Sequence, residues 1–247
     1  MRIVVFSDTH GHCFALDAML EDLRGESYDS MVCLGDAVQG GPQPVETVAR
    51  LRELSCPIIM GNADDWLLTG QDSGAEPISE ERLRKLEAVR EWQLSKLSSS
   101  DLDFIQTFQP TIELPLEAGW KLRSFHGSPK SFDDVILPLT PDDEVRAFLD
   151  PQPQTIYCGG HTHVQFVRQF ADGFHFNPGS VGLAFREGQP ENVRLINPWA
   201  EYAILTVSKT RMNLEFRRAY YPVSLAHEIY LASGRPFAEE SAQQYHE

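Results

Sequence analysis

The sequence predicts an α/β protein, and three observations support this. Short apolar runs typical of strands alternate with segments of helical apolar spacing in the first quarter of the chain, which indicates βαβ units around a largely parallel sheet. The second half is mostly strand-like, with turn residues between the strands. The 247 residues are 42% hydrophobic and 23% charged, an ordinary globular composition for which one large core is the simplest arrangement. We therefore expect a single domain over residues 1–247.

The apolar patterns predict the elements of the first half in order. They are a strand over Ile3–Phe6, a helix over Phe14–Leu23, a strand over Met31–Leu34, a helix over Val45–Leu54 and a strand over Ile58–Met60. The longest predicted helix runs from Ser79 to Leu97, because Ser79 can cap it and acidic residues in its first turn suit the helix dipole. Its buried stripe is expected to contain Leu83, Leu86, Val89 or Arg90, Gln93 and Leu97.

The second half is predicted to contain five strands, one short helix and a helical tail. The strands are Trp120–Phe125, Thr155–Cys158, Val164–Phe170, Tyr202–Val207 and Asn213–Arg218, and the short helix is Glu144–Leu149. The tail begins at about residue 222. We expect it to form one helix over Ser224–Ala232 and then to fray, since Pro236 and a polar run follow.

The charge of the chain excludes some classes of function. Lys and Arg number 21 against 36 Asp and Glu, which gives a net charge of −15 and a pI of about 4.9. Such a field repels phosphate backbones and anionic membranes, so neither nonspecific nucleic-acid binding nor membrane binding is expected. The four cysteines form no CxxC pair, and the start of the chain is not typical of a leader. We therefore expect a reduced, cytoplasmic protein.

Polar clusters follow five of the apolar runs directly. Ligands in open α/β sheets bind just beyond the carboxyl ends of the strands. The residues in such positions are Asp8 and His10, then Asp36, Asn62 and His126, and finally His161 and His163. We therefore expect two Asp, one Asn and four His to meet at one edge of one sheet.

These residue types together are typical of a transition-metal site. Imidazole and carboxylate groups bind Mn, Fe, Co, Ni or Zn, and no thiolate is needed. Seven ligands exceed what one tetrahedral ion uses, and they suit two ions about 3.5–4 Å apart that share a carboxylate. Each fragment alone is common in turns and caps, so the prediction depends on their combination, each after a strand.

In this combination the chain resembles the calcineurin-like metallophosphoesterases, in particular the small bacterial and archaeal phosphodiesterase-type members. The matching segments are Ser7-Asp8-Thr9-His10-Gly11, Leu34-Gly35-Asp36, Met60-Gly61-Asn62-Ala63-Asp64, Phe125-His126-Gly127-Ser128-Pro129, Gly160-His161-Thr162-His163 and Asn177-Pro178-Gly179-Ser180-Val181-Gly182. The resemblance extends from Ile3 to Gly182. It implies a four-layer αββα sandwich, with two mixed sheets and helices outside.

The resemblance also implies a role for each ligand. One divalent transition-metal ion would be held by Asp8, His10, Asp36 and His163, and a second by Asp36, Asn62, His126 and His161. Asp36 would bridge the two ions, with Mn favoured among Mn, Fe, Ni, Co and Zn. A hydroxide bridging the metals would attack phosphorus in line, and Asn62 would also touch a phosphate oxygen.

One position departs from the family pattern. Ala63 stands where the family carries a histidine that helps to protonate or orient the leaving group. A positioned acid is typically worth about 10²–10⁴ in rate. The substrate then has a good leaving group, or another residue replaces the acid, or the enzyme is slow. His12 is the first candidate replacement, followed by Asp64 and Asp65.

Three hypotheses about function follow. The leading one is a dinuclear metal-dependent hydrolase of phosphodiesters or phosphomonoesters, with diesters favoured and a small phosphate ester or nucleotide as substrate. The alternative is a catalytically weak or inactive scaffold on the same fold that binds other proteins. Ala63 favours the scaffold, whereas the complete ligand set counts against it, because unused buried polar groups are costly. A mononuclear hydrolase of carbonyl substrates is the third. A homodimer is compatible with the sequence and is not required by it.

Overall fold

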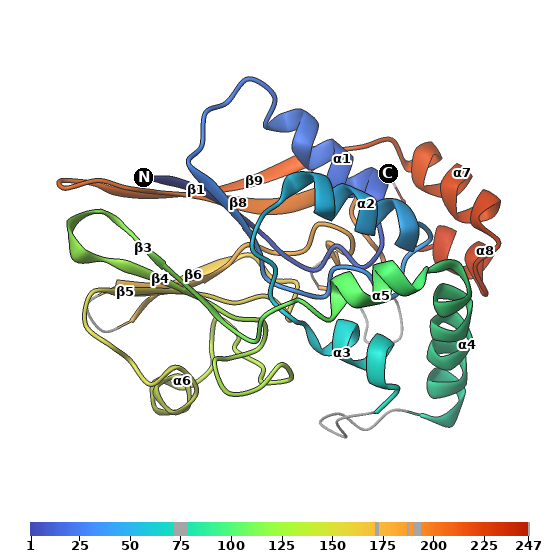
Figure 1. Ribbon diagram of the computed structural model, residues 1–247, viewed down its shortest axis with the longest axis horizontal. Coiled ribbons are helices and arrows are strands. Elements are labelled where there is room, and N and C mark those ends of the chain that lie inside the picture. The colour runs from blue at the N-terminus through green and yellow to red at the C-terminus, as the bar shows by residue number, and fades with distance from the viewer. Residues whose placement is uncertain (72–78, 171–172, 187, 190–193, 247) are drawn as a thin grey trace.

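Two β-sheets lie face to face, with helices on their outer sides (Figure 1). The computed structural model describes residues 1–71, 79–170, 173–186, 188–189 and 194–246. The first sheet has the order β2-β1-β8-β9, formed by β2 (Ser30–Cys33), β1 (Arg2–Phe6), β8 (Trp199–Val207) and β9 (Met212–Tyr220). The second has the order β3-β4-β5-β7-β6, formed by β3 (Ile112–Pro115), β4 (Lys121–Ser124), β5 (Thr155–Cys158), β7 (Gly173–Asn177) and β6 (Phe166–Phe170).

The helices complete the outer layers. Next to the first sheet lie α1 (Cys13–Asp22) and α2 (Pro44–Leu54), and next to the second lies α6 (Asp142–Leu149) (Figure 1). Further helices lie together at one end of the sandwich. They are α3 (Asn62–Thr69), α4 (Glu80–Lys96), α5 (Ser99–Ile105), α7 (Val223–Ser233) and α8 (Ala238–Ala242). A short 3₁₀ helix, η1 (Glu117–Gly119), connects β3 to β4. The expected α/β sandwich of four layers is confirmed.

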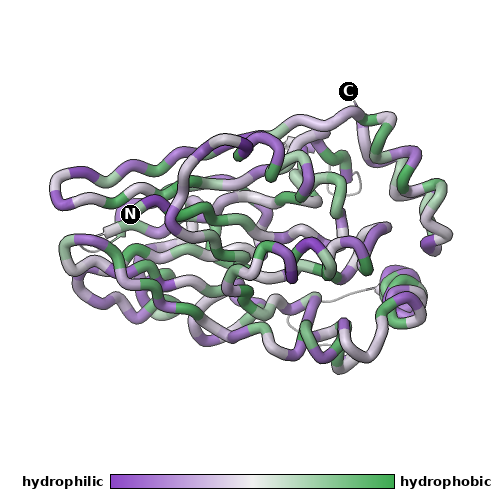
Figure 2. Tube along the Cα trace, turned by 45° about the horizontal axis from the view of Figure 1, so that its top comes forward, coloured by the Kyte–Doolittle hydropathy of each residue, from purple (hydrophilic) through white to green (hydrophobic). Residues whose placement is uncertain are grey.

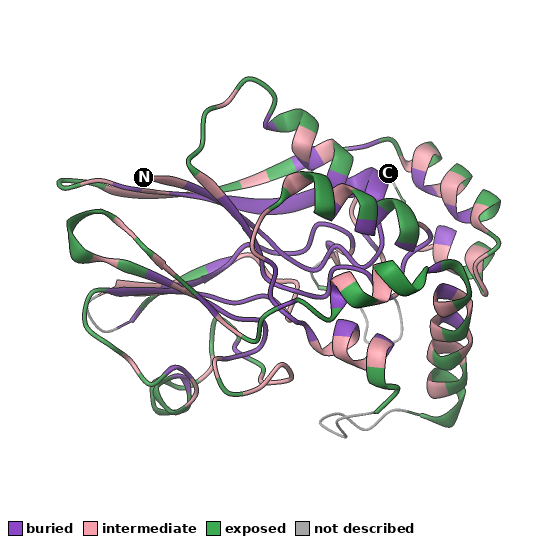
Figure 3. Ribbon diagram, viewed as in Figure 1, coloured by how far each residue is buried: buried purple, intermediate pink, exposed green. Residues whose placement is uncertain are grey.

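Both sheets are mixed, as expected. In the first sheet β1 pairs in parallel with β2 and antiparallel with β8. In the second, β5 pairs in parallel with β4 and β7, and the outer strands β3 and β6 run antiparallel to their neighbours. Hydrophobic residues recur along the strands of both sheets (Figure 2), and the strands and the loops at the centre are the most buried parts of the chain (Figure 3).

Alternation along the strands divides the core into layers. In β1, Ile3 and Val5 join the cluster between the sheets, whereas Val4 and Phe6 join the cluster that contains α1. Ile156 of β5 likewise faces the first sheet, and its neighbour Tyr157 packs with Val145 and Leu149 of α6. Because successive side chains of a strand point to opposite faces, each apolar strand contributes to two layers at once.

One predicted strand differs from expectation, and the longest predicted helix begins as expected. Ile58–Met60 was expected to be a strand, but Ile58 and Ile59 form only single bridges, with Cys33 and Gln109 respectively. The chain leaves the sheet here because α3 begins directly afterwards, at Asn62. The long helix, in contrast, begins as predicted, since Oγ of Ser79 accepts a hydrogen bond from the backbone N–H of Arg82 at 3.3 Å.

The predicted fraying of the tail is wrong. After α7 the chain forms α8, and Tyr245 beyond it is only 1% exposed. Its ring packs near those of Phe14, Tyr221 and Tyr230. The polar composition of the tail concealed this contact, because one buried aromatic ring is enough to dock a short segment.

The expectation that the ligands share one edge of one sheet is also wrong. Asp8 and Asp36 follow β1 and β2 of the first sheet, whereas His126 follows β4 and the pair His161 and His163 follows β5, both in the second sheet. The candidate site therefore lies where the carboxyl ends of strands from two sheets meet. Among the described residues, no helix has the length and apolar character needed to cross a membrane.

Candidate metal centre

The seven predicted ligands come together in two groups. Asp8, His10 and His163 form one, and Asp36, His126 and His161 form the other, with the ligand atoms of each group within 4.8 Å of one another. The side-chain oxygen of Asn62 belongs with the second group, since it lies 3.0 Å from Nε2 of His126 and 3.1 Å from Nδ1 of His161. The structure thus brings together every residue that the sequence nominated as a metal ligand.

Asp36 lies between the two groups. Its Oδ2 is 3.4 Å from Nε2 of His126 and 3.6 Å from Nε2 of His10, which belong to different groups. Its Oδ1 accepts a hydrogen bond from the backbone N–H of Ala63 at 2.8 Å. One oxygen therefore fixes the carboxylate while the other faces both groups.

Three of the histidines are oriented by backbone carbonyls. Nδ1 of His10, His126 and His163 lies 2.9, 2.8 and 3.0 Å from the carbonyl oxygens of Gln39, Leu34 and Leu183, respectively. Because a carbonyl only accepts, each Nδ1 carries the proton. The Nε2 lone pairs are then left to face the site, and those of His10 and His163 are only 3.2 Å apart. Two such lone pairs repel each other unless a proton or a metal ion lies between them, so this arrangement fits a bound cation.

Burial and charge favour a cation at this place. Burial by itself raises the pKa of the Asp36 carboxyl, but His126, His10 and His161 hold that pKa well below its usual range. Burial lowers the pKa of His126, but Asp36 and Asp8 outweigh it and raise that pKa to about 10. Oδ1 of Asp8 is buried, and Nε2 of His163 lies 3.2 Å from it. A buried carboxylate is costly unless a positive charge compensates it, so the surroundings stabilise positive charge.

The backbone is strained at the ligands. Five of them have a positive φ: Asp8 (54°), His10 (46°), Asp36 (48°), His161 (68°) and His163 (57°). Each such residue costs about 1–2 kcal/mol, and strain of this kind clusters at functional sites. Hydrogen bonds between the two ligand loops maintain it, since Asp8 N–H donates to Gly35 O at 3.0 Å and His10 N–H to Asp36 O at 2.8 Å.

Glycine is required where backbone approaches the carboxylates. A Cβ added to Gly61 would lie 2.1 Å from Oδ1 of Asp36. One added to Gly160 would lie 2.8 Å from Oδ2 of Asp8, and 2.1 Å from Oγ of Ser7. Both segments carry a ligand directly after the glycine, so the close approach brings that ligand to the site.

His12 and Asp64, two of the three candidate replacements for the missing acid, are engaged elsewhere. Nδ1 of His12 donates to Thr9 O at 3.0 Å, its Nε2 accepts from the Tyr230 hydroxyl at 2.7 Å, and burial lowers its pKa to about 3. Asp64 accepts backbone N–H bonds from Ala37 at 2.9 Å and Val38 at 3.0 Å, and burial together with Asp36 raises its pKa to about 7. These contacts argue against an acid role for either residue, and they indicate that Asp64 supports the loop after Asp36.

Several supporting residues were not predicted as functional. Nδ2 of Asn177 donates to Gly160 O at 2.6 Å, and Oγ of Ser180 donates to Asp8 O at 2.8 Å, so the Asn-Pro-Gly-Ser segment braces two ligand loops. Gln93 of α4 is fully buried and bonds to the loop after Asp36. The sequence signal that could have identified Gln93 is its position, as a polar residue, within the predicted buried stripe of a helix.

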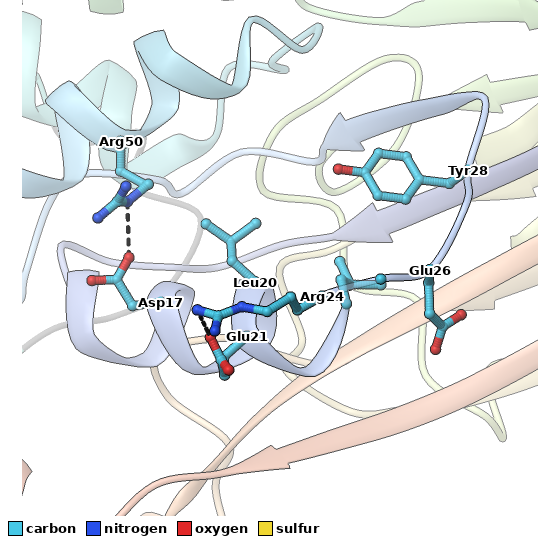
Figure 4. Close-up of a pocket in the computed structure, with 9 residues that line it drawn as sticks. Asp17, Leu20, Glu21, Arg24, Glu26, Tyr28 and Arg50 are labelled. Carbon is cyan, nitrogen blue, oxygen red and sulfur yellow. Dashed lines mark ion pairs between the residues drawn. The ribbon is translucent and has the colours of Figure 1, made fainter.

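A surface hollow of about 500 Å³ lies apart from these ligands, beside α1 and α2. Its lining includes Asp17, Arg24, Tyr28 and Arg50, and Arg50 pairs with Asp17 at 2.8 Å (Figure 4). None of the seven candidate ligands lines it, so it is a separate feature of the outer helical layer.

Comparison with known proteins agrees with the geometry. Residues 1–199 match the calcineurin-like phosphoesterase superfamily domain. The chain belongs to this family. The resemblance inferred from the sequence motifs is therefore confirmed.

Individual relatives are moderately similar. Uncharacterized protein MJ0912 from Methanocaldococcus jannaschii is 29% identical over 199 residues, which are 79% of this chain and 74% of that protein. Phosphodiesterase YfcE from Escherichia coli K12 is 24% identical over 213 residues, 80% of this chain and 88% of that protein. The family is one of phosphoesterases, and the second of these relatives is named as a phosphodiesterase.

Solved structures share the fold over nearly the whole chain. A metallophosphoesterase from Sphaerobacter thermophilus has a TM-score of 0.68 at 24% identity, covering 99% of this chain and 98% of that one. Hypothetical protein PH1004 from Pyrococcus horikoshii OT3 has a TM-score of 0.76 at 20% identity, covering 98% and 96%. The segment beyond residue 199 is thus part of the shared fold.

Proposed function

We propose that this protein is a metal-dependent phosphoesterase that uses two divalent transition-metal ions and hydrolyses phosphodiesters in preference to phosphomonoesters. The observation that carries the proposal is the position of Asp36, whose Oδ2 faces His10 of one ligand group and His126 of the other. A carboxylate in that position suits a bridge between two ions. The phosphodiesterase among the relatives favours diesters as substrates.

In this proposal each ion has its own ligands. Asp8, His10 and His163 would hold one ion and Asn62, His126 and His161 the other, with Asp36 shared. When bound, such a pair of ions polarises a phosphoryl oxygen and activates water for attack on phosphorus. The imidazole and carboxylate ligands suit Mn, Fe, Co, Ni or Zn, and we favour Mn. The chain itself orients the ligands, through the carbonyls that fix the imidazole rings and the N–H of Ala63 that fixes Asp36.

The absence of an acid at position 63 limits the substrate. Ala63 cannot donate a proton, and the contacts of His12 and Asp64 described above leave neither to replace it. We therefore propose substrates whose leaving group needs little protonation, such as a nucleotide anhydride or an aryl phosphate ester. With a net charge of −15, the chain would repel an anionic substrate unless bound cations attracted it locally.

The test compares hydrolysis of bis-p-nitrophenyl phosphate and p-nitrophenyl phosphate with added Mn²⁺. Both esters have a good leaving group, so the lack of an acid does not hide activity. The variant is Asp36→Asn, and the matched control is Asp103→Asn, which makes the same change at an exposed position on α5. Bound Mn²⁺ and thermal unfolding are measured for each protein.

The proposal expects Mn²⁺-dependent cleavage, faster with the diester, that is lost in D36N and retained in D103N. Undiminished turnover in folded D36N would refute the bridging role of Asp36. If the wild-type protein binds two ions per chain and cleaves neither ester, the scaffold hypothesis gains support, because the ligand set would then be intact without catalysis.

A further inference from the structure

The C-terminal segment reaches back to the loops that carry the candidate ligands. It comprises α7, α8 and the residues around them, and it lies beyond residue 199, where the match to the family domain ends. In Figure 1, α7 and α8 lie at the same end of the molecule as α4. Arg235, between α7 and α8, connects this segment to the loop that follows Asp36.

The Arg235 side chain is held at several points. Its Nε donates to Gly40 O at 2.6 Å, and its Nη1 donates to Pro236 O at 2.9 Å and to Oγ of Ser241 at 2.8 Å. The guanidinium also lies over the ring of Tyr230, 5.6 Å from the centroid. A planar guanidinium makes these contacts simultaneously because its donors form a rigid fork. The Gly40 carbonyl is therefore anchored to the C-terminal segment.

The loop at Gly40 in turn orients His10. The carbonyl of Gln39, one residue earlier, accepts from Nδ1 of His10 at 2.9 Å. The N–H of Gly40 donates to Oε1 of Gln93 at 3.0 Å, and Nε2 of Gln93 donates to Val38 O at 3.1 Å. A Cβ placed on Gly40 would lie 3.7 Å from Nδ1 of His10, so this backbone lies against the imidazole. Gln93 thus accepts a hydrogen bond from the N–H of Gly40, and Arg235 donates one to the carbonyl of Gly40.

We propose that Arg235 is a positioning residue for the metal ligand His10 and acts through the backbone of Gly40. Gly40 has φ +122°, a conformation open to glycine, so its peptide groups turn easily once the guanidinium is removed. The peptide group that carries the Gln39 carbonyl is then held through Gln93 alone, so the orientation of His10 is less tightly fixed. Groups that orient a metal ligand are typically worth about 10–100-fold in metal affinity or activity.

The effect is expected at one ion only. His10 belongs to the group with Asp8 and His163, whereas Asp36, His126 and His161 form the other. The inference rests on the proposed function, since it requires two ions per chain. It goes further in assigning a role to a residue outside the matched family domain.

The test is calorimetric titration of the metal-free full chain with Mn²⁺, together with amide hydrogen exchange of residues 38–41. The variants are Arg235→Gln and Arg235→Lys. The control is Lys85→Met, which removes an ion pair of 2.9 Å between α4 and Glu240 of α8. This control loosens the same segment without touching a ligand loop. Thermal unfolding is recorded for all the proteins.

The expected result for R235Q is about a tenfold or greater loss of affinity at one Mn²⁺ site, an unchanged second site and faster exchange at residues 38–41. R235K should be intermediate, because it retains a donor but not the fork, and K85M should bind both ions as the wild type does. Equal loss at both sites, or no loss in folded R235Q, would overturn the proposal. If R235Q does not fold, the test is made with R235K. Unchanged Mn²⁺ affinity of R235K at both sites would then overturn the proposal. A wild-type chain that does not bind two ions would instead contradict the proposed function.

Discussion

Replacing Gly61 by alanine tests how closely the backbone must approach the bridging carboxylate. Gly61 has φ −97° and ψ 168°, an extended conformation that alanine adopts without strain. The added Cβ would nevertheless lie 2.1 Å from Oδ1 of Asp36 and 2.3 Å from its backbone nitrogen, where separations below 3.0 Å are essentially never found. Asp36 or Gly61 must therefore move by about 1 Å.

A displacement of this size is large for a catalytic group, since a misplacement of about 1 Å can cost about 10²-fold in rate. We expect G61A to cleave bis-p-nitrophenyl phosphate about 10²-fold more slowly than the wild type at saturating Mn²⁺. The bound metal, measured by elemental analysis after gel filtration, should also fall. The variant should remain folded, because the clash is confined to Asp36 and leaves the hydrophobic core unchanged.

The matched control is Gly25→Ala. Gly25 has φ +83°, and an added Cβ there would meet nothing within 4 Å. G25A should lose about 1–2 kcal/mol of stability through left-handed strain and keep its metal and its rate. If G61A retained wild-type rate and metal content, Asp36 would not be confined as the geometry indicates, and the reasoning about the bridge would be refuted.

Three further predictions concern stability, the missing acid and metal binding. His175 packs against Phe125 and Phe166, its ring nitrogens meet no hydrogen-bond partner among the described residues, and burial lowers its pKa to about 3. Since this lies below the unfolded value of about 6.5, the unfolded chain binds the proton first as the pH falls, and stability is lost from about pH 6.5 down to pH 3. Between pH 7 and pH 5 this residue is expected to reduce the free energy of unfolding by about 2 kcal/mol. In urea denaturation at these two pH values, H175F should therefore lose about 2 kcal/mol less than the wild type. An unchanged pH dependence in H175F would contradict the assignment. Ala63→His should raise the rate on a phenyl ester by up to about 10²-fold and leave the p-nitrophenyl ester little changed, so equal effects on the two esters would argue against a missing acid. Mn²⁺ at about a thousand times its Kd should stabilise the chain by about 4 kcal/mol, or about 10 °C in Tm, and a chelator should abolish this shift in differential scanning fluorimetry. A Tm that does not respond to Mn²⁺ would count against the metal site.

Features that are encoded locally could be predicted from the amino-acid sequence alone. Thr155–Cys158, a strand-like run between turn residues, was predicted as a strand with the observed bounds, and Ser79 marked the start of α4. The candidate ligands could be nominated because each follows a strand and belongs to a short motif, in which residue type and position within the loop are both visible. Their chemistry, imidazole and carboxylate without thiolate, also follows from residue type alone.

The tertiary structure decided which of these local pieces meet. Parallel strands can belong to one sheet or to two without any change in their own pattern, so only the folded chain showed that the ligands come from both sheets. The sequence made His12 a candidate acid, and only the folded chain places the Tyr230 hydroxyl, 218 positions away, on its Nε2. The hydrogen bond from Arg235 to Gly40 joins residues 195 positions apart, and no sequence pattern around either residue predicted it. Contacts of this kind depend on how distant elements pack, whereas strands, caps and motifs are set by neighbours along the chain.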